Sequence, residues 1–329
     1  MATYKEIKGD VVERVASDPT NPGAGDIWYN TTTGVLKGYT FTAAAWASGG
    51  NLTSVKMGGA GCGTQTATLV FGGNNPPPTI NLTGKTEEYN GSSWSEQNDL
   101  NTTRQGMGGA GTQTAGLSFA GRLDPPTSLK NETEEYNGSS WTSVNNVNTA
   151  RVNPGGTGTQ TAALAFGGEA NPITGATEEY DGTNWTTSPG SLNTPRENPE
   201  GAGTQTAGLA FGGYDGTAAT AVTEEYNGTS WTSGGSMGNA RYSLAGGGLQ
   251  TAAIAFGGDP GRKVNTELYD GTSWSVTTDL TNGRSSLQAG NASPNSASIA
   301  VGGRTSTVAV ALTEEFTGEF NAVETFTTS

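Results

Sequence analysis

The sequence predicts an all-β protein built from repeated four-stranded units, and three observations carry this prediction. Glycine accounts for 52 of the 329 residues, and only 14% of the residues are charged. Short landmarks recur in a fixed order about every 45 residues. Each landmark has either the period-two polarity of a strand or the composition of a tight turn. Because stacked repeats share their core, a chain with few large apolar side chains can still fold in this way.

The first landmark is a strand that ends in a pair of glycines. In GTQTAGLAFGG (203–213), the apolar residues Ala207, Leu209 and Phe211 alternate with small or polar ones. This alternation is typical of a strand, in which successive side chains point to opposite faces. Small residues on one face predict a close approach of neighbouring units. The closing glycine of each copy is Gly73, Gly121, Gly168, Gly213, Gly258 and, in a weaker copy, Gly303.

The second landmark predicts a hairpin. In TEEYNGTSW (223–231), Asn227-Gly228 suits a two-residue turn because both positions tolerate a positive φ, and Trp231 opens the next strand. Copies begin at Thr86, Thr133, Thr177, Thr266 and, in degenerate form, Thr313. A third landmark is a turn-like stretch that ends in an arginine, before a further short strand, at Arg104, Arg151, Arg196, Arg241 and Arg284.

Four short strands in about 45 residues are typical of one blade of a β-propeller, in which four-stranded sheets pack radially. Residues 25–46 look like the last three strands of one more, diverged repeat, because Trp46 precedes Trp94 by the usual spacing. The sequence therefore predicts seven four-stranded blades. Six blades plus an N-terminal module is the alternative.

The predicted boundaries follow from this reading of the repeats. The propeller is expected over 25–329, with a diverged first repeat at 25–54 and clear repeats at 55–329. Residues 1–24 are predicted to form an arm or connector. The terminal VETFTTS could close the ring by supplying the strand that the first blade lacks.

Composition excludes several kinds of function. The chain has no histidine, which rules out Ser-His-Asp catalysis and most zinc, copper and haem sites. Its single cysteine, Cys62, rules out an internal disulfide and is predicted to be an inert thiol. The net charge of −14 argues against a nucleic-acid partner, which requires clustered Lys and Arg. We therefore expect no cofactor and no metal.

The chain also shows no sign of membrane insertion or export. No apolar run reaches the roughly 20 residues of a membrane span. The N-terminal MATYKEIKGDVVERV lacks the apolar core of a signal peptide. We expect a protein that is made in the cytoplasm without a signal peptide.

The repeated carboxylates and tryptophans are predicted to serve the scaffold. Adjacent residues of a pair such as Glu224-Glu225 point to opposite faces of a strand, whereas glycosidase chemistry needs two carboxylates that flank one bond. We expect one Glu of each pair to accept hydrogen bonds from the backbone or from an arginine of the third landmark. Tryptophans such as Trp231 recur so regularly that packing is favoured over sugar stacking. No catalytic residue is predicted.

The informative positions are those that do not repeat, between each glycine pair and the following hairpin. These loops differ in length, proline content and charge. In a propeller they share one face with the connections between blades, and exposed loops on such a face often carry function. Neutral drift in exposed turns is the alternative. The candidate binding residues are Asn74, Pro76, Pro77, Pro78, Pro125, Pro126, Tyr214, Asp215 and Asp259.

The landmarks resemble the kelch repeat, which has an arginine at its start, a glycine pair, a tyrosine and a tryptophan. Arg196, Gly212-Gly213, Tyr226 and Trp231 match one such unit. Two units depart from the pattern, because Ala120 replaces a glycine and the last unit has Phe316 and no aligned tryptophan. The opening YKEIKG and GDIWYNTTTGVLKG, followed by tandem GAGTQTAGLAFGG and TEEYNGTSW, are similar to kelch-like proteins of marine bacteriophages and to segments of phage tail-fibre and virion proteins.

This resemblance implies a non-enzymatic structural protein of a phage particle. Such a protein would be an appendage, fibre-associated or surface component that mediates host attachment or contacts between subunits. The expected partners are other virion proteins, further copies of the chain, or a glycan or protein on the host surface. A carbohydrate-binding propeller and a propeller polysaccharide hydrolase are the alternatives. A copper oxidase of the kelch type is excluded, because its metal site needs histidines.

Overall fold

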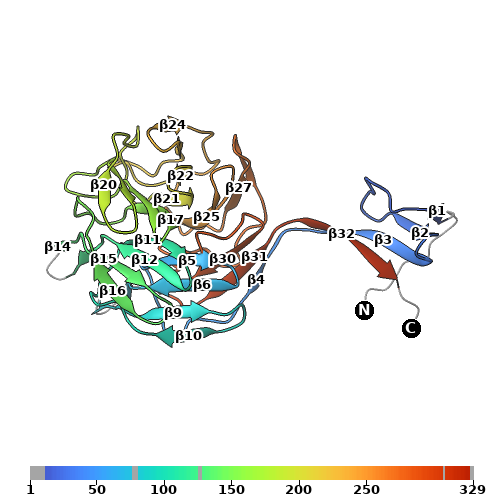
Figure 1. The fold of residues 1–329 in the computed structure, drawn as a ribbon, viewed down its shortest axis with the longest axis horizontal. Helices are drawn as coiled ribbons and strands as arrows, with labels where there is room; N and C mark the ends of the chain where they lie inside the picture. Colours follow the sequence, from blue (N-terminus) through green and yellow to red (C-terminus); the bar gives the residue numbers. More distant parts are fainter. Residues whose placement is uncertain (1–11, 76–80, 125–127, 307, 327–329) are drawn as a thin grey trace. The chain divides into compact units, whose positions relative to one another are not determined.

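The computed structural model describes residues 12–75, 81–124, 128–306 and 308–326, and all regular structure within them is β. The chain divides into two compact units (Figure 1). The smaller unit combines both chain ends, Met1–Ala44 and Gly318–Ser329. The larger unit is Ala45–Thr317. The prediction of an all-β fold is therefore confirmed for the described residues.

The larger unit contains six four-stranded antiparallel sheets among its described residues. Sheet 1 consists of β5 (Ala60–Thr64), β6 (Ala67–Phe71), β9 (Thr86–Tyr89) and β10 (Trp94–Gln97). Sheet 2 consists of β11 (Gly108–Thr112), β12 (Ala115–Phe119), β15 (Thr133–Tyr136) and β16 (Trp141–Val144). Sheet 3 consists of β17 (Gly155–Thr159), β18 (Ala162–Phe166), β19 (Thr177–Tyr180) and β20 (Trp185–Thr187).

The remaining three sheets follow the same strand order, and the last one borrows a strand. Sheet 4 consists of β21 (Glu200–Gly203), β22 (Gly208–Phe211), β23 (Thr223–Tyr226) and β24 (Trp231–Ser233). Sheet 5 consists of β25 (Ala245–Leu249), β26 (Ala252–Phe256), β27 (Thr266–Tyr269) and β28 (Trp274–Val276). Sheet 6 consists of β29 (Gln288–Ala289), β30 (Ala297–Val301), β31 (Thr313–Thr317) and β4 (Ala45–Ser48). Two short pairs lie in loops, β7 (Asn74–Asn75) with β8 (Asn81–Leu82) and β13 (Arg122–Leu123) with β14 (Ser128–Leu129).

The first strands of the sheets lie around a common centre, which makes the larger unit propeller-like (Figure 1). Each first strand contacts that of the next sheet, and β29 also contacts β5. Glycine permits this close approach. A Cβ on Gly61 would lie 2.5 Å from the carbonyl oxygen of Ala289, and one on Gly156 would lie 2.8 Å from that of Gly109. The prediction that small residues let neighbouring units approach closely is confirmed.

Tryptophans connect the sheets to one another. The indole Nε1 of each sheet donates to a threonine Oγ1 of the preceding sheet at 2.9–3.1 Å. These bonds run through all six sheets and return to the first. The predicted packing role is confirmed for the following pairs: Trp94–Thr313, Trp141–Thr86, Trp185–Thr133, Trp231–Thr177, Trp274–Thr223 and Trp46–Thr266.

A second set of bonds joins tyrosines to the second glutamate of the preceding sheet. Tyr226, for example, donates to Glu179 at 2.6 Å. The same contact joins Tyr89 to Glu315, Tyr136 to Glu88, Tyr180 to Glu135 and Tyr269 to Glu225. The two sequence departures, Leu268 and Phe316, occupy the two ends of the one contact that this pattern leaves out. They are thus a matched apolar replacement between sheets 5 and 6.

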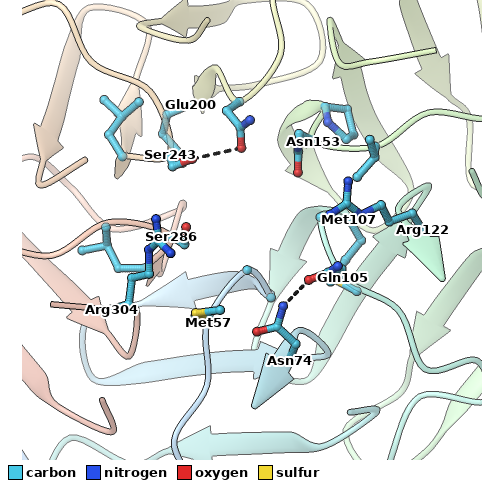
Figure 2. A pocket seen from close by; sticks show the side chains of 18 of the residues that line it. Met57, Asn74, Gln105, Met107, Arg122, Asn153, Glu200, Ser243, Ser286 and Arg304 are labelled. Atoms are coloured by element: carbon cyan, nitrogen blue, oxygen red, sulfur yellow. Dashed lines mark hydrogen bonds between the residues drawn. The ribbon is translucent and has the colours of Figure 1, made fainter. Parts of the chain in front are cut away.

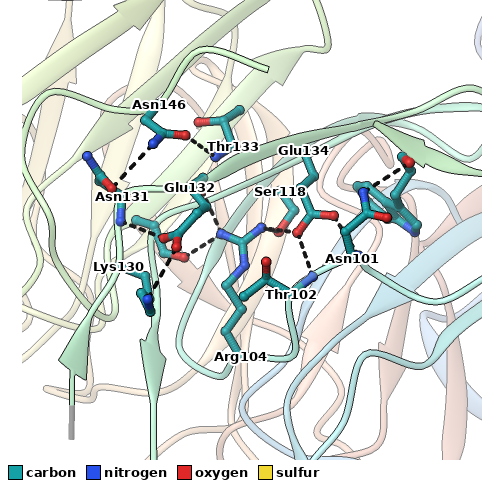
Figure 3. A network of polar contacts seen from close by, with 12 residues as sticks. Asn101, Thr102, Arg104, Ser118, Lys130, Asn131, Glu132, Thr133, Glu134 and Asn146 are labelled. Atoms are coloured by element: carbon teal, nitrogen blue, oxygen red, sulfur yellow. Dashed lines mark hydrogen bonds and ion pairs between the residues drawn. The ribbon is translucent and has the colours of Figure 1, made fainter. Parts of the chain in front are cut away.

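The first glutamate of each pair is fully or almost fully buried in an ion pair with the cation that precedes its sheet. In sheet 2, Arg104 Nη2 lies 2.8 Å from Glu134 Oε1, while Arg104 Nη1 donates to the carbonyl of Glu132 (Figure 3). Arg104 Nη1 also donates to the carbonyl of Ala120. Glu134 also accepts from the backbone amide of Asn101. The predicted structural role of this glutamate is confirmed. The six pairs are Lys56–Glu87, Arg104–Glu134, Arg151–Glu178, Arg196–Glu224, Arg241–Glu267 and Arg284–Glu314.

The smaller unit is a four-stranded sheet in the order β1 (Glu13–Val15), β2 (Ile27–Asn30), β3 (Val35–Thr42) and β32 (Phe320–Phe326). Strand β1 runs parallel to β2, and the other pairs are antiparallel. Asp18 fixes the turn between β1 and β2, because it accepts hydrogen bonds from Trp28, Asn30 and Lys37. The segment predicted as an arm thus contributes a strand to this sheet.

The structure corrects the prediction that residues 25–46 supply three strands of one repeat. Strands β2 and β3 belong to the smaller unit, whereas β4 pairs with β31 of sheet 6. The physical reason is that the last repeat lacks its own tryptophan strand. Trp46 on β4 supplies the missing indole, which bonds to Thr266 and packs edge-on against Phe256 at 4.9 Å between ring centroids.

Candidate functional site

Six residues near the centre of the larger unit adopt the left-handed conformation, with φ between 50° and 63°. Each follows a buried Lys or Arg by two positions. Their backbone amides and carbonyls bond to one another at 2.7–3.0 Å, except that Ser243 Oγ bonds to Asn198 Oδ1 at 3.2 Å. Left-handed backbone is costly for residues other than glycine, so these shared bonds stabilise it. We call this set the inner ring: Gly58, Gly106, Asn153, Asn198, Ser243 and Ser286.

The variable loops begin beside the inner ring. The residue that follows each glycine pair forms a bridge with the residue that follows the buried cation, as Tyr214 does with Glu197. The same structural position therefore carries amide, cationic, anionic and aromatic side chains in different sheets. We call these residues the rim: Asn74, Arg122, Glu169, Tyr214, Asp259 and Arg304.

A cavity of about 400 Å³ opens at this place (Figure 2). Members of the inner ring line it, as do Asn74, Arg122 and Arg304 of the rim. Further in, the residue after each inner-ring residue supplies an apolar wall in five of the six sheets. We call this wall the collar: Met107, Pro154, Pro199, Leu244 and Leu287.

A second cavity of about 80 Å³ shares most of the collar and continues beyond it. Glu200 lines both cavities and is the one carboxylate among the described residues that line either. Although Glu200 keeps some contact with the cavity, removal from bulk water raises the pKa of its carboxyl group to about 8. The corresponding residues of the other sheets are Ala60, Gly108, Gly155, Ala245 and Gln288.

Three of the binding residues predicted from the sequence belong to the rim, each in a different sheet. Asn74 is buried and donates to Gln105 Oε1. Tyr214 packs against Tyr242 with ring centroids 5.6 Å apart. Asp259 is 6% exposed and lies 3.9 Å from Arg304 Nη2.

The other predicted residues lie elsewhere. Asp215 accepts hydrogen bonds from Thr217 and from the amide of Ala218, so it holds the turn of its own loop. It also lines a shallow pocket beside Pro172 and Ile173. Pro76, Pro77, Pro78, Pro125 and Pro126 lie outside the described residues.

Sequence reasoning missed Arg122, Arg304 and Glu200. A signal for each was present, because aligning the residue after each glycine pair identifies the rim, and Glu200 interrupts a column of mostly small residues. Lys56 was missed because a lysine replaces the expected arginine. Cys62 was noticed, and it is fully buried, which raises the pKa of its thiol.

Within the described residues, no three His, Cys, Asp or Glu side chains gather as a metal site, and no helix could cross a membrane. No family model matches the chain, and no curated protein is significantly similar to it. What distinguishes the site is a non-repeating rim around a cavity with a polar entrance, an apolar collar and a single carboxylate.

Proposed function

We propose that the chain is a non-enzymatic structural protein of a phage particle that binds a partner through the rim and the cavity it surrounds. The rim carries this proposal, because one structural position holds amide, cationic, anionic and aromatic side chains in the six sheets. Three of these residues, Asn74, Arg122 and Arg304, line the cavity. Repeated positions must satisfy the same contacts at each interface, whereas the rim is free to match one partner. The kelch-like and phage-like sequence segments support the assignment to a virion.

The larger unit is proposed to be a six-bladed kelch-like propeller. Six tryptophan bonds that return to the first sheet support this number, as does the contact between β29 and β5. The ring is proposed to close through β4, which comes from the N-terminal side and completes the last sheet. Full closure protects sheet edges that would otherwise pair with other chains.

The smaller unit is proposed to attach the protein to other virion subunits. It contains both chain ends. Its β3 and β32 expose Phe41, Phe320 and Val323 at 44–50% of their surface. Exposed apolar side chains on a paired sheet suit a contact between proteins.

The repeated carboxylates argue against a hydrolase. The first glutamate of each pair forms an ion pair with a buried cation, and the second glutamate accepts a hydrogen bond from a tyrosine, as in Arg196–Glu224 and Tyr226–Glu179. A glycosidase needs two carboxylates across one bond, and the cavity walls described here offer one. A carbohydrate partner remains the second candidate. It is favoured by the Tyr214–Tyr242 pair, which is partly exposed at the rim and could stack against a sugar ring.

The test has two parts, a location and a contact. Antibodies raised against the purified chain should label purified particles of the phage that encodes it. Particles that carry Tyr214→Ala with Arg304→Ala should adsorb to host cells, or assemble, less well than wild type. Particles with Val276→Ala, at a side chain that is 75% exposed and outside the rim, are the matched control. Unlabelled particles would refute the virion role, and normal behaviour of the rim variant would refute the role of the rim.

A further inference from the structure

Glu200 breaks the repeat without a compensating change. Four of the five corresponding residues are alanine or glycine, and they leave room at the centre. The Glu200 carboxylate accepts a hydrogen bond from the backbone amide of Gly201. Glu200 is partly buried, and partial removal of a carboxylate from water without a cation is costly, so a proton or a cation would stabilise it.

Apolar side chains share the cavity wall with Glu200. The collar contributes methionine, leucine and proline side chains to the same lining. A ligand bound at Glu200 can therefore pack an aliphatic part against the collar. A charged end that also reaches Asn291 must be compact, because the smaller cavity that both residues line is only about 80 Å³.

A second acceptor lines the smaller cavity together with Glu200. Asn291 is 6% exposed and lines the smaller cavity. Its Nδ2 donates to the carbonyl of Gly109 at 3.1 Å, which fixes the amide, and its buried Oδ1 has no hydrogen-bond partner among the described residues. Gln288 Oε1 is also buried and unpartnered, but it lies beside Gly302. The acceptors that we assign to the cavity are therefore Glu200 and Asn291.

We propose that this cavity binds an aliphatic primary ammonium group, with Glu200 as its counter-ion and the collar around its methylene chain. This inference rests on the proposed binding function of the rim and deepens it. An ammonium is a compact point charge on a flexible stem, whereas a guanidinium is a wide planar fork. An ammonium also brings three donors to a place where acceptors are unpartnered.

Other charges near the entrance do not oppose this assignment. Arg122 is paired with Asp124 at 3.0 Å, and Asp259 lies 3.7 Å from Arg262 and 3.9 Å from Arg304. Glu197 accepts from Asn153 Nδ2 at 2.9 Å next to the inner ring and adds negative charge. The net charge of −14 also favours a cationic ligand over an anionic one. A bare divalent metal is less well matched, since hard cations take several oxygen ligands and usually more than one carboxylate.

The first experiment uses the full-length protein and needs no variant. Binding of n-butylamine is compared with binding of n-butanol by NMR titration at about pH 8.5, where most of the amine and much of the Glu200 carboxyl group is charged. We expect the amine to bind at least about tenfold more tightly, which corresponds to about 1.4 kcal/mol. Equal binding of the two compounds would overturn the proposal.

The second experiment removes the charge. Glu200→Gln keeps the shape of the side chain and should abolish the preference for the amine. Glu96→Gln, on β10 and outside the rim and the cavity, should keep it. Melting curves of both variants show whether they are folded. An unchanged preference in Glu200→Gln would contradict the role of Glu200.

A third arm separates two sources of the ammonium. If Nα-acetyl-lysine N-methylamide, or a peptide that contains lysine, binds at least about tenfold more tightly than n-butylamine, then a lysine of a partner polypeptide is the ligand. If the two bind equally, a free alkylamine is the ligand. The neutral norleucine analogue should bind in neither case. Loss of adsorption in the rim variant without any amine binding would leave the proposed function standing and refute only this inference.

Discussion

The two places where the repeat is broken differ in one respect. Between sheets 5 and 6, a tyrosine and a glutamate are both replaced by apolar residues, Phe316 and Leu268, so that neither polar group is left without its partner. In the central cavity, Glu200 and Asn291 break the repeat and remain without matching partners. Compensated exceptions preserve an interface, whereas an uncompensated polar group lowers stability and persists for another reason. This difference is the reason why we propose Glu200 and Asn291, and not Leu268 and Phe316, as binding residues.

The largest loss of stability is expected at the tryptophans, which make the same contact in all six sheets. Trp231→Ala and Trp46→Ala should each lower the free energy of unfolding by about 3–5 kcal/mol, because both empty a buried aromatic site. Trp231 and Trp46 are 5% and 9% exposed, and each bonds to a threonine of the preceding sheet. Urea unfolding of both variants measures this. A loss below about 1 kcal/mol for Trp46→Ala alone would show that β4 does not close the ring as the other strands do.

The paired replacement of Leu268 and Phe316 can be reversed by mutation in two steps. Phe316→Tyr alone should cost about 1–3 kcal/mol, because a buried hydroxyl would face Leu268 without a partner. Leu268→Glu with Phe316→Tyr should recover most of that loss, since it recreates the contact of the other sheets. A double-mutant cycle measures the coupling. Additive effects of the two changes would mean that the residues do not face each other.

The free energy of unfolding should depend on pH through Glu200, which breaks the repeat without a compensating change. The pKa of Glu200 is raised to about 8 in the folded protein, so the unfolded chain loses this proton first as the pH rises. The contribution of Glu200 to stability therefore declines between its unfolded pKa and about 8. At about pH 9, Glu200→Gln should be more stable than wild type by about 1–3 kcal/mol, and at about pH 4 the two should be equal. Thermal melting across this range tests the sign, and a stabilisation independent of pH would contradict it.

The smallest effect is expected at the rim. Tyr214→Ala should change the free energy of unfolding by no more than about 0.5 kcal/mol, as is usual for partly exposed positions. Its effect should appear in binding or adsorption instead. A loss of stability as large as that of the tryptophan variants would move Tyr214 from the binding residues to the scaffold.

The repeated part of the fold could be predicted from the sequence because each sequence landmark recurs five or six times. The glycine pairs, the hairpins, the buried glutamates and the packing of the tryptophans all follow from local patterns. The strand pairs β4 with β31 and β3 with β32 could not be predicted, because they join residues from opposite ends of the chain. Trp46 showed the usual spacing, but spacing does not reveal which sheet a strand completes.

The candidate site was predicted in part. Asn74, Tyr214 and Asp259 were selected because they lie in loops that do not repeat, and the structure places them at equivalent positions of three sheets. Glu200 was missed because it belongs to a strand, whereas candidate binding residues were sought only in the loops. Asn291 could not have been singled out, since its importance depends on a carbonyl of Gly109 far away in the sequence.

The route of the chain between the two units gives the molecule the organisation of an inserted domain. Thr42 at the end of β3 pairs with Phe320 at the start of β32, and Ala45 pairs with Thr317 where the chain enters and leaves sheet 6. Residues 45–317 therefore interrupt what would otherwise be an ordinary hairpin. A short turn in their place would leave the smaller sheet connected, and the excised segment would keep adjacent ends. Recombination at this point would exchange the larger unit for another domain while the smaller sheet is inherited unchanged.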